Sequence, residues 1–200
     1  RVLFRSYKRK DHYYQKAKEQ GLASRAIFKL EEIDRQYRLF DVGGRVIDLG
    51  CAPGGWLQYI AKKIGSSGKA VGIDLLKVKA QFPSYVTILQ GDATDPKIQL
   101  EALKLLGGSA DAVVSDLSPN LSGVRFRDNF LSYELALTVL KVAKQFLKKG
   151  GNLVLKIFPG DELPNYKKEL LLAFEEIKTF IPEATRKGSS EIYLIAKRFQ

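Results

Sequence analysis

Four aspartates stand at the ends of short apolar runs, and a glycine-rich segment follows the first of them. The aspartates are Asp48, Asp74, Asp92 and Asp116, and the segment is Gly-Cys-Ala-Pro-Gly-Gly-Trp over residues 50–56. Short apolar runs are typical of buried strands in a parallel sheet, whose carboxyl ends meet at one edge. We therefore expect the carboxylates and the glycine loop to share one site, with the loop cradling a ligand against its backbone.

The spacing of the glycine loop discriminates among nucleotide-like ligands. A Walker loop requires Lys and Ser/Thr after its last glycine, but Trp56 follows Gly55. A dinucleotide loop requires Gly-x-Gly-x-x-Gly, whereas Ala52 occupies the second glycine position and Pro53 lacks an amide donor. The loop therefore disfavours both ATP and NAD.

S-adenosylmethionine carries no phosphate and suits these residues better. The loop glycines permit close backbone approach, and Asp74, 20 residues beyond Gly54, is placed for the ribose hydroxyls. Asp92 is placed to accept from the adenine amine, and Asp48 and Asp116 to hold the amino end. The predicted cofactor-binding residues are therefore Asp48, Gly50, Gly54, Gly55, Asp74, Asp92 and Asp116.

The residues after the fourth predicted strand reduce the number of chemical groups that could accept the methyl group. Methyltransferases of exocyclic base amines carry an aromatic residue after Asp/Asn-Pro-Pro, where this chain has Asn120. Methylation of cytosine carbon needs a cysteine nucleophile near the fourth or fifth strand, but Cys51 lies in the glycine loop. A hydroxyl acceptor remains, and Lys156, a charge inside the apolar run 153–158, is a candidate to handle its proton. The alternative is a strand-end lysine that reaches water.

Alternating strands and helices must position these residues. Apolar periodicity predicts a doubly wound α/β sheet of about seven strands. The predicted strands are 46–49, 69–75, 85–89, 110–114, 152–158, 177–181 and 191–196, and the predicted helices are 11–20, 24–38, 56–64, 95–106, 130–147 and 164–174. Glycines 150 and 151 are expected to separate the fifth helix from the fifth strand.

The charge of the chain is positive and unevenly distributed. The 200 residues carry 33 Lys+Arg against 22 Asp+Glu, and residues 1–30 alone hold nine basic and two acidic side chains. Phe4, Tyr7, Tyr13 and Tyr14 interleave with this basic segment, a pattern typical of surfaces that contact phosphates and stack bases of nucleic acid. The alternative is the solvated, lysine-rich surface of heat-adapted proteins.

Other features of the composition limit the kinds of protein that this chain could be. Cys51 is the only cysteine, which excludes an internal disulfide and favours the reducing cytoplasm. No window approaches the roughly 18 uninterrupted apolar residues of a membrane helix, so we expect a soluble protein without a membrane partner. His12 is the only histidine, and we expect no metal site. Length and apolar content predict a single domain over residues 1–200.

Five segments resemble the FtsJ/RlmE-type ribose 2′-O-methyltransferases of large-subunit ribosomal RNA. They are SRAIFKL at 24–30, DLGCAPGGW at 48–56, DLSPN at 116–120, VLKIF at 154–158 and SEIY at 190–193. The resemblance implies a Rossmann-like class I S-adenosylmethionine-dependent fold, mostly parallel with an antiparallel last strand. It implies cofactor contacts at Gly54, Trp56, Asp74, Asp92 and Asp116, and a Lys-Asp-Lys-Glu catalytic set at Lys29, Asp116, Lys156 and Glu191.

The resemblance also implies an activity: methyl transfer to a uridine ribose 2′-OH by a monomer acting on ribosomal RNA or the large subunit. Residues 1–38 would contribute to RNA binding. A lysine with the reference pKa of about 10.4 is a poor base, so Lys156 would need a lower pKa from burial and from Lys29. Asp116 would align Lys156, and Glu191 would help to hold the nucleotide. The alternatives are a tRNA anticodon-loop ribose methyltransferase and a non-catalytic RNA-binding assembly factor.

Overall fold

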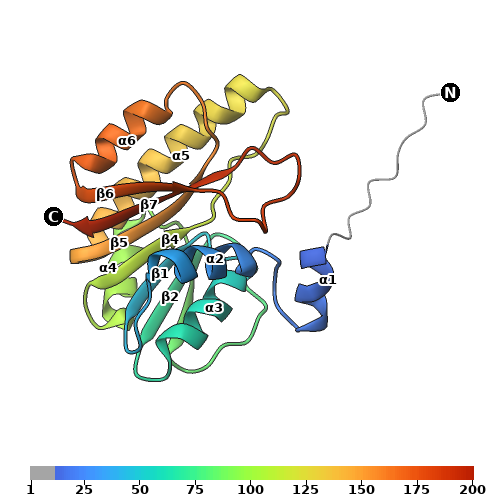
Figure 1. Cartoon of the computed structure of the whole chain (residues 1–200). Coiled ribbons are helices and arrows are strands. Elements are labelled where there is room, and N and C mark those ends of the chain that lie inside the picture. Colours follow the sequence, from blue (N-terminus) through green and yellow to red (C-terminus); the bar gives the residue numbers. More distant parts are fainter. Residues whose placement is uncertain (1–11) are drawn as a thin grey trace.

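Seven strands form one sheet in the computed structural model, which describes residues 12–200. The basic and aromatic residues of segment 1–11, which the sequence assigns to RNA binding, lie outside the described residues. The sheet order is β3-β2-β1-β4-β5-β7-β6 (Figure 1). The strands are β1 (Arg45–Leu49), β2 (Lys69–Asp74), β3 (Val86–Gln90), β4 (Ala110–Ser115), β5 (Leu147–Ile157), β6 (Phe174–Phe180) and β7 (Ile192–Phe199).

The strand directions confirm the Rossmann-like fold expected from the sequence. Strands β3, β2, β1, β4 and β5 pair in parallel, whereas β7 lies antiparallel between β5 and β6. The carboxyl ends of the parallel strands therefore lie at one edge of the sheet. This edge is where an open α/β sheet binds its ligands.

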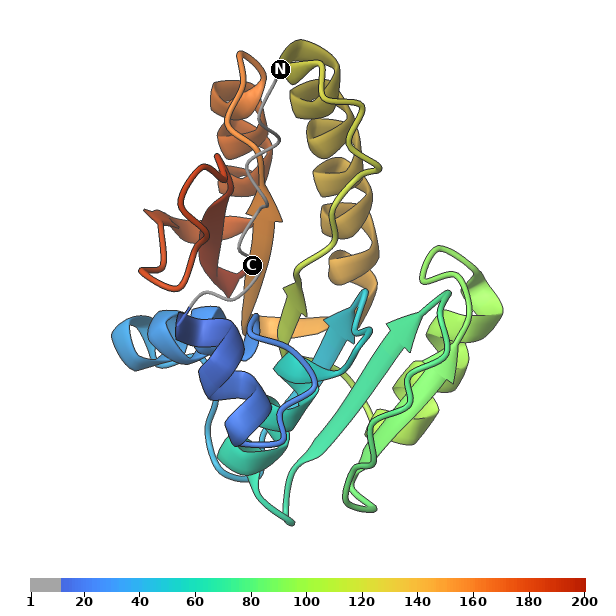
Figure 2. The same cartoon turned by 90° about the vertical axis from the view of Figure 1, so that its right-hand side faces the viewer.

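Helices cover both faces of the sheet, as Figure 2 shows from the side. The helices are α1 (His12–Glu19), α2 (Ile27–Tyr37), α3 (Gly55–Ile64), α4 (Pro96–Leu106), α5 (Arg125–Phe146) and α6 (Leu163–Leu171). Alternate strand residues face opposite layers. In β4, Val113 packs in the core with α4, α5 and α6, whereas Val114 packs in the core with α2 and α3. Both cores fix the strand ends from which the site is built.

Several predicted boundaries were wrong. At the end of the chain, α6 ends at Leu171 instead of residue 174, β6 begins at Phe174 instead of residue 177, and β7 ends at Phe199 instead of residue 196. The fifth helix begins at Arg125 instead of residue 130, because the Asp128 carboxylate accepts from Ser122 and Gly123 and closes the turn before it. β5 begins at Leu147 instead of residue 152, because Leu147 pairs with Ala110 of β4 ahead of a register shift. Gly150 and Gly151 therefore lie within β5 and do not separate it from α5. α2 begins at Ile27 instead of residue 24, and no side chain caps its first turn.

Two properties of residues 12–200 bear on function. No helix in this range combines the length and apolar character needed to cross a membrane. No three His, Cys, Asp or Glu side chains in this range gather as a set that would hold a metal ion.

Candidate active site

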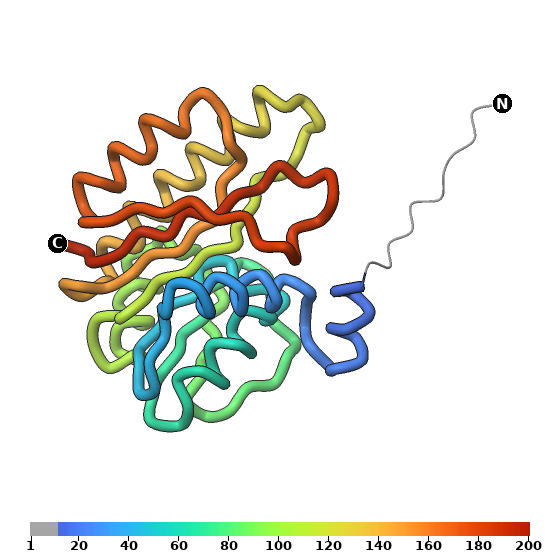
Figure 3. Tube along the Cα trace, viewed as in Figure 1, coloured from blue at the N-terminus to red at the C-terminus, as the bar shows by residue number. Residues whose placement is uncertain are grey.

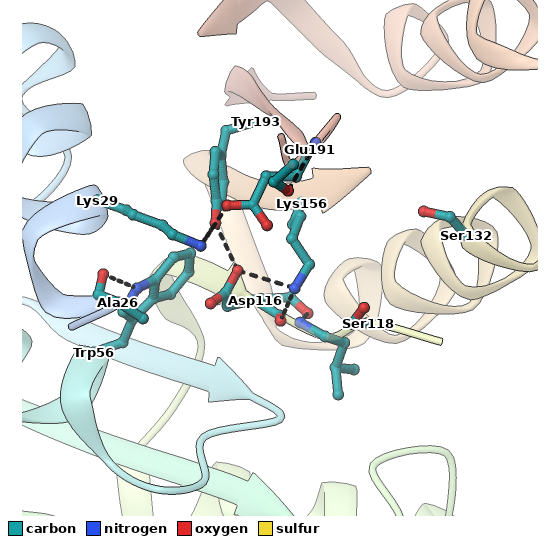
Figure 4. Close-up of polar contacts among 12 residues, drawn as sticks. Ala26, Lys29, Trp56, Asp116, Ser118, Ser132, Lys156, Glu191 and Tyr193 are labelled. Atoms are coloured by element: carbon teal, nitrogen blue, oxygen red, sulfur yellow. Dashed lines mark hydrogen bonds and ion pairs between the residues drawn. The ribbon is translucent and has the colours of Figure 1, made fainter. Parts of the chain in front are cut away.

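Three strand ends and one helix bring the predicted catalytic residues together. Asp116 directly follows β4, and Lys156 lies one residue before the end of β5. Lys156 is paired across the sheet with Tyr193 of β7, so both side chains leave the same face. Lys29 reaches them from α2, and Glu191 directly precedes β7. Segments far apart in the sequence thus meet in one place (Figure 4).

The four predicted catalytic residues are linked in one continuous set of contacts, with Tyr193 at its centre. Lys29 Nζ lies 2.5 Å from Glu191 Oε1 and donates to the Tyr193 hydroxyl over 3.1 Å. The Tyr193 hydroxyl donates to Asp116 Oδ1 over 2.7 Å. Lys156 Nζ donates to the Asp116 carbonyl over 2.7 Å and lies 3.3 Å from Asp116 Oδ1. Each charge therefore has a partner of opposite sign.

Burial makes these contacts strong constraints on geometry. The side chains of Lys29 and Glu191 are each 11% exposed, and that of Lys156 is 9% exposed. Removing one partner of such a pair leaves an uncompensated buried charge, which costs about 3–5 kcal/mol. The set is therefore held in one arrangement before any substrate arrives.

Tyr193 is a site residue that the sequence interpretation missed. Its ring is fully buried, and burial, with the nearby carboxylates of Asp116 and Glu191, raises the pKa of its hydroxyl well above the usual value. The phenol therefore stays protonated and donates a hydrogen bond to Asp116. Its position two residues after Glu191, on the same face of a strand, is the sequence signal that would have identified it.

A small, mostly apolar cavity lies beside the glycine loop. It has a volume of about 210 Å³ and is bordered by the ends of β1, β2 and β3 and by α5. Asp74 and Asp92 both line it. Asp74 accepts from the backbone N–H groups of Ala52 and Leu76, so its carboxylate is fixed with acceptor capacity left over. Apolar walls with two fixed carboxylates suit a nucleoside.

The pKa values of Asp92 and Asp48 shift in opposite directions. Hydrogen bonds from the Thr94 amide and hydroxyl hold the pKa of Asp92 below its usual value, so Asp92 is ionised at neutral pH. Asp48 is 1% exposed, and its Oδ2 has no hydrogen-bond partner among the described residues. Burial, with the charges of Asp116 and Asp74, raises the pKa of Asp48 well above its usual value. A cationic ligand group would satisfy this carboxylate.

The three glycines of the loop are needed for a reason that the sequence did not reveal. A Cβ on Gly50 would lie 2.2 Å from Leu117 Cδ2, and one on Gly55 would lie 2.3 Å from Ser24 Oγ. A Cβ on Gly54 would lie 2.8 Å from Phe82 Cζ. On the side where a Cβ would project, neighbouring side chains of the chain occupy the space. The expected close approach of the glycine backbone to the cofactor stays a prediction.

Gly50→Ala is expected to destabilise the protein and to distort the loop. Gly50 has φ +77°, where an L residue is strained, and the new methyl group must displace Leu117. Left-handed strain and overpacking together predict a loss of about 2–4 kcal/mol, or roughly 5–15 °C in Tm. Thermal unfolding measures it. The matched control is Gly150→Ala, at φ +82° with no atom within 4 Å of the new methyl group. Equal losses in both variants would show that contact with Leu117 is unimportant.

A larger cleft opens beside the linked charges. Its volume is about 620 Å³, and both Lys29 and Glu191 line it. Its other basic lining residues are Arg25, Arg125, Arg186 and Lys187. The positive lining suits a polyanion. The cleft has about three times the volume of the cavity beside the glycine loop.

The segment between β6 and β7 forms one wall of this cleft and descends onto α2 (Figure 3). Glu32 on α2 fixes it, accepting from the backbone N–H of Glu183 over 2.6 Å and of Ala184 over 3.0 Å. Arg25 adds a donor bond to the Ala184 carbonyl. The same segment leads to Glu191, so we expect Glu32 to act as a positioning residue.

Glu32→Gln is expected to weaken substrate use while leaving cofactor binding unchanged. The amide has one acceptor oxygen where the carboxylate uses two, and a charge-assisted bond to backbone is lost. We expect KM for the nucleic acid to rise about tenfold. Steady-state kinetics and cofactor calorimetry measure the two effects. Glu31→Gln, which removes the same charge one residue away, is the control, and an equal KM change there would contradict the positioning role.

The comparison with protein families decides the class. The model of the FtsJ-like methyltransferase family matches residues 22–199. The chain belongs to the FtsJ-like methyltransferase family. Two relatives, both named ribosomal RNA large subunit methyltransferase E, come from Methanothermobacter thermautotrophicus and Syntrophobacter fumaroxidans. The first is 40% identical over 96% of this chain and 92% of the relative, and the second is 41% identical over 98% of each.

Solved structures support the fold of this FtsJ-like methyltransferase. A structure described as a ribosomal RNA methyltransferase from Plasmodium falciparum has a TM-score of 0.77 and 27% identity, covering 88% of this chain and 98% of that chain. Fibrillarin from Aeropyrum pernix, with natively bound S-adenosylmethionine, has a TM-score of 0.54 and 19% identity, covering 78% of this chain and 67% of that chain. The second likeness concerns the fold alone.

The residues of this FtsJ-like methyltransferase fit S-adenosylmethionine, the cofactor of the family. The unpaired oxygen of Asp48 suits the cationic amino end, and the cavity with Asp74 and Asp92 suits the nucleoside. The Trp56 indole donates to the Ala26 carbonyl over 2.8 Å and is 3% exposed. Its side chain thus joins α3 to α2, and its role in cofactor binding stays a prediction.

Proposed function

We propose that this methyltransferase transfers a methyl group from S-adenosylmethionine to a uridine ribose 2′-OH of large-subunit ribosomal RNA. The observation that carries the proposal is the linked set Glu191, Lys29, Tyr193, Asp116 and Lys156 beside a basic cleft. The names of the relatives support ribosomal RNA as the substrate. We further propose a cytoplasmic monomer with one domain, in which residues 1–38 contribute to RNA binding.

Lys156 is the residue that handles the hydroxyl proton in this proposal. When bound, the cofactor supplies an electrophilic methyl carbon on a sulfonium sulfur. Lys156 Nζ can make three hydrogen bonds, and two of these directions are taken by the carbonyl and the carboxylate of Asp116. The third direction is left for the substrate hydroxyl. Lys156 Nζ, entering the reaction in its unprotonated form, would orient the 2′-oxygen and accept its proton while the new O–C bond forms and the bond between the methyl carbon and the sulfur breaks. Asp116 holds the nitrogen in place and balances the charge that it gains.

The remaining members of the set position the substrate. Lys29 and Glu191 line the cleft, where they hold the nucleotide through its ribose and phosphate. Tyr193 connects Lys29 to Asp116, which is the partner of Lys156. A displacement of Lys29 is therefore transmitted to Asp116. Correct alignment of the reacting atoms supplies a large part of the rate, and this connected geometry favours it.

Methylation assays on matched transcripts test the substrate. Large-subunit ribosomal RNA and tRNA are each incubated with the protein and labelled cofactor, and the modified nucleotide is mapped. We expect label in the ribosomal RNA. Label confined to the tRNA anticodon loop would replace the proposal by the tRNA enzyme. Absence of cofactor binding in calorimetry would instead assign the chain to a non-catalytic RNA-binding assembly factor.

A further inference from the structure

A second hollow lies next to the basic cleft, between the N-terminal ends of α5 and α6, and has no role in the chemistry above. Figures 1 and 2 show both helix starts at the same end of the molecule. The hollow has a volume of about 560 Å³. Its aromatic lining residues are Phe126, Phe130, Tyr133 and Phe158. Within residues 12–200, no lysine lines it, which distinguishes it from the cleft.

Two phenylalanines of this hollow are exposed on one helix face. Phe126 is 77% exposed and Phe130 is 46% exposed. They are four residues apart on α5, so their rings lie on the same side of the helix. A single exposed aromatic residue is ordinary, but a pair lining a hollow offers flat surfaces to a flat ligand.

The hollow is continuous with the cleft that receives the acceptor. Arg125, Asn129 and Phe158 line both spaces. A single strand whose target ribose occupies the cleft therefore has its neighbouring nucleotide at the hollow. Arg125 stands at the junction, where the phosphate between the two nucleotides would pass. Asn129 is fixed there by donating to the Pro159 carbonyl over 2.9 Å.

The polar rim favours a base over a phosphate. Asp161 and Glu162 line the side formed by the start of α6. Carboxylates repel phosphate, but they accept hydrogen bonds from the amino groups of bases. Arg125 on one side and the carboxylates on the other thus match the two ends of a nucleotide.

We propose that this hollow binds the base of the nucleotide next to the methylated one, stacked on Phe126 and Phe130 with its amino edge toward Asp161 and Glu162. The inference rests on the proposed function. It makes the hollow a subsite for single-stranded RNA whose neighbouring base has been unstacked. It also explains why large apolar side chains are exposed beside a basic cleft.

The double variant Phe126→Ala/Phe130→Ala tests the subsite. We expect KM for the RNA to rise about tenfold or more, with kcat and cofactor binding little changed. Phe126→Trp, which keeps a stacking plane, should stay near the wild-type KM. The control is Leu172→Ala, because Leu172 is 76% exposed and lies just after α6, outside the hollow. Unchanged KM in the double variant would overturn the proposal.

RNA substrates that are changed at the nucleotide next to the methylated one test the base subsite independently of the proposed function. After the modified nucleotide is mapped, the adjacent base is removed to give an abasic site on either side. One abasic RNA should raise the wild-type KM about as much as the double variant does. Uracil at that position, which lacks an amino group, should raise KM less. Normal use of both abasic RNAs would overturn the subsite alone, whereas no methylation of intact RNA would overturn the proposed function.

A protein partner is the competing occupant. If the double variant is impaired on assembled large subunits but not on naked transcript, the hollow contacts a ribosomal protein and the proposal is wrong. Impairment on both substrates supports the nucleotide subsite.

Discussion

Lys156→Ala is expected to lower kcat about 100-fold or more, while the affinity for S-adenosylmethionine stays close to that of the wild type. Proton handling by a positioned group contributes about 10²–10⁴ in rate. Among the described residues, the hydrogen bond and the ion pair of Lys156 both go to Asp116, and Lys156 does not line the cavity beside the glycine loop. The loss should therefore appear in the chemical step.

Single-turnover methyl transfer and calorimetry of cofactor binding measure the two quantities separately. The matched control is Lys148→Ala, because Lys148 is also a β5 lysine paired with an aspartate, Asp111, but lies at the other end of the strand. The control should transfer methyl groups at the wild-type rate. A Lys156→Ala rate within about threefold of the wild type would remove Lys156 from its role.

Asp48→Asn is expected to act in opposite directions on stability and on cofactor binding. In the free protein, Asp48 is a buried carboxylate with an unpaired oxygen, and its raised pKa records the cost of ionising it. Neutral asparagine removes much of this cost, about 1–3 kcal/mol, which corresponds to roughly 2–10 °C in Tm. The cofactor then loses a charged partner for its amino group, so Kd should rise about 10- to 100-fold.

The raised pKa of Asp48 predicts how the stability gained by Asp48→Asn changes with pH. A group whose pKa is raised on folding stabilises the protein below its unfolded pKa, about 3.9 for Asp, and this stabilisation is lost as pH rises through the folded value. The stability difference between Asp48→Asn and the wild type should therefore grow from acid toward neutral pH.

Thermal unfolding across this pH range, with and without cofactor, measures the Asp48 effect. Asp111→Asn is the control, and it should change stability in the opposite direction. Hydrogen bonds from Lys148 and the Arg45 amide hold the pKa of Asp111 below its usual value. That variant should be less stable than the wild type at neutral pH. An Asp48→Asn protein that is no more stable without cofactor, or that binds cofactor normally, would contradict the assignment.

The sequence predicted the elements whose signals are local. Apolar runs that end in Asp48, Asp74 and Asp116 predicted β1, β2 and the loop after β4. Asp95 followed by Pro96 predicted the start of α4, where the Asp95 carboxylate accepts from the Lys97 amide. These features depend on neighbouring residues alone, so they are readable without the fold.

Features that depend on tertiary contacts were not predictable in this way. The early start of α5 depends on the turn that Asp128 closes, and the early start of β5 depends on pairing with β4. Tyr193 was missed because a tyrosine in an apolar strand resembles a core residue until Lys29 and Asp116 meet its hydroxyl. The contact that excludes a Cβ at Gly50 was not predicted, because Leu117, more than sixty residues later, lies beside Gly50 only in the fold.

The position of the transferred methyl group tests the central claim most directly. Alkali cleaves RNA through its free 2′-hydroxyls, so a ribose 2′-O-methyl group protects the adjoining phosphodiester. Large-subunit ribosomal RNA is labelled with methyl-labelled cofactor, digested with alkali and analysed by mass spectrometry. We predict one alkali-resistant dinucleotide carrying the label on a uridine ribose, absent with Lys156→Ala. Label on a base, or label only in alkali-sensitive products, would contradict ribose 2′-O-methylation.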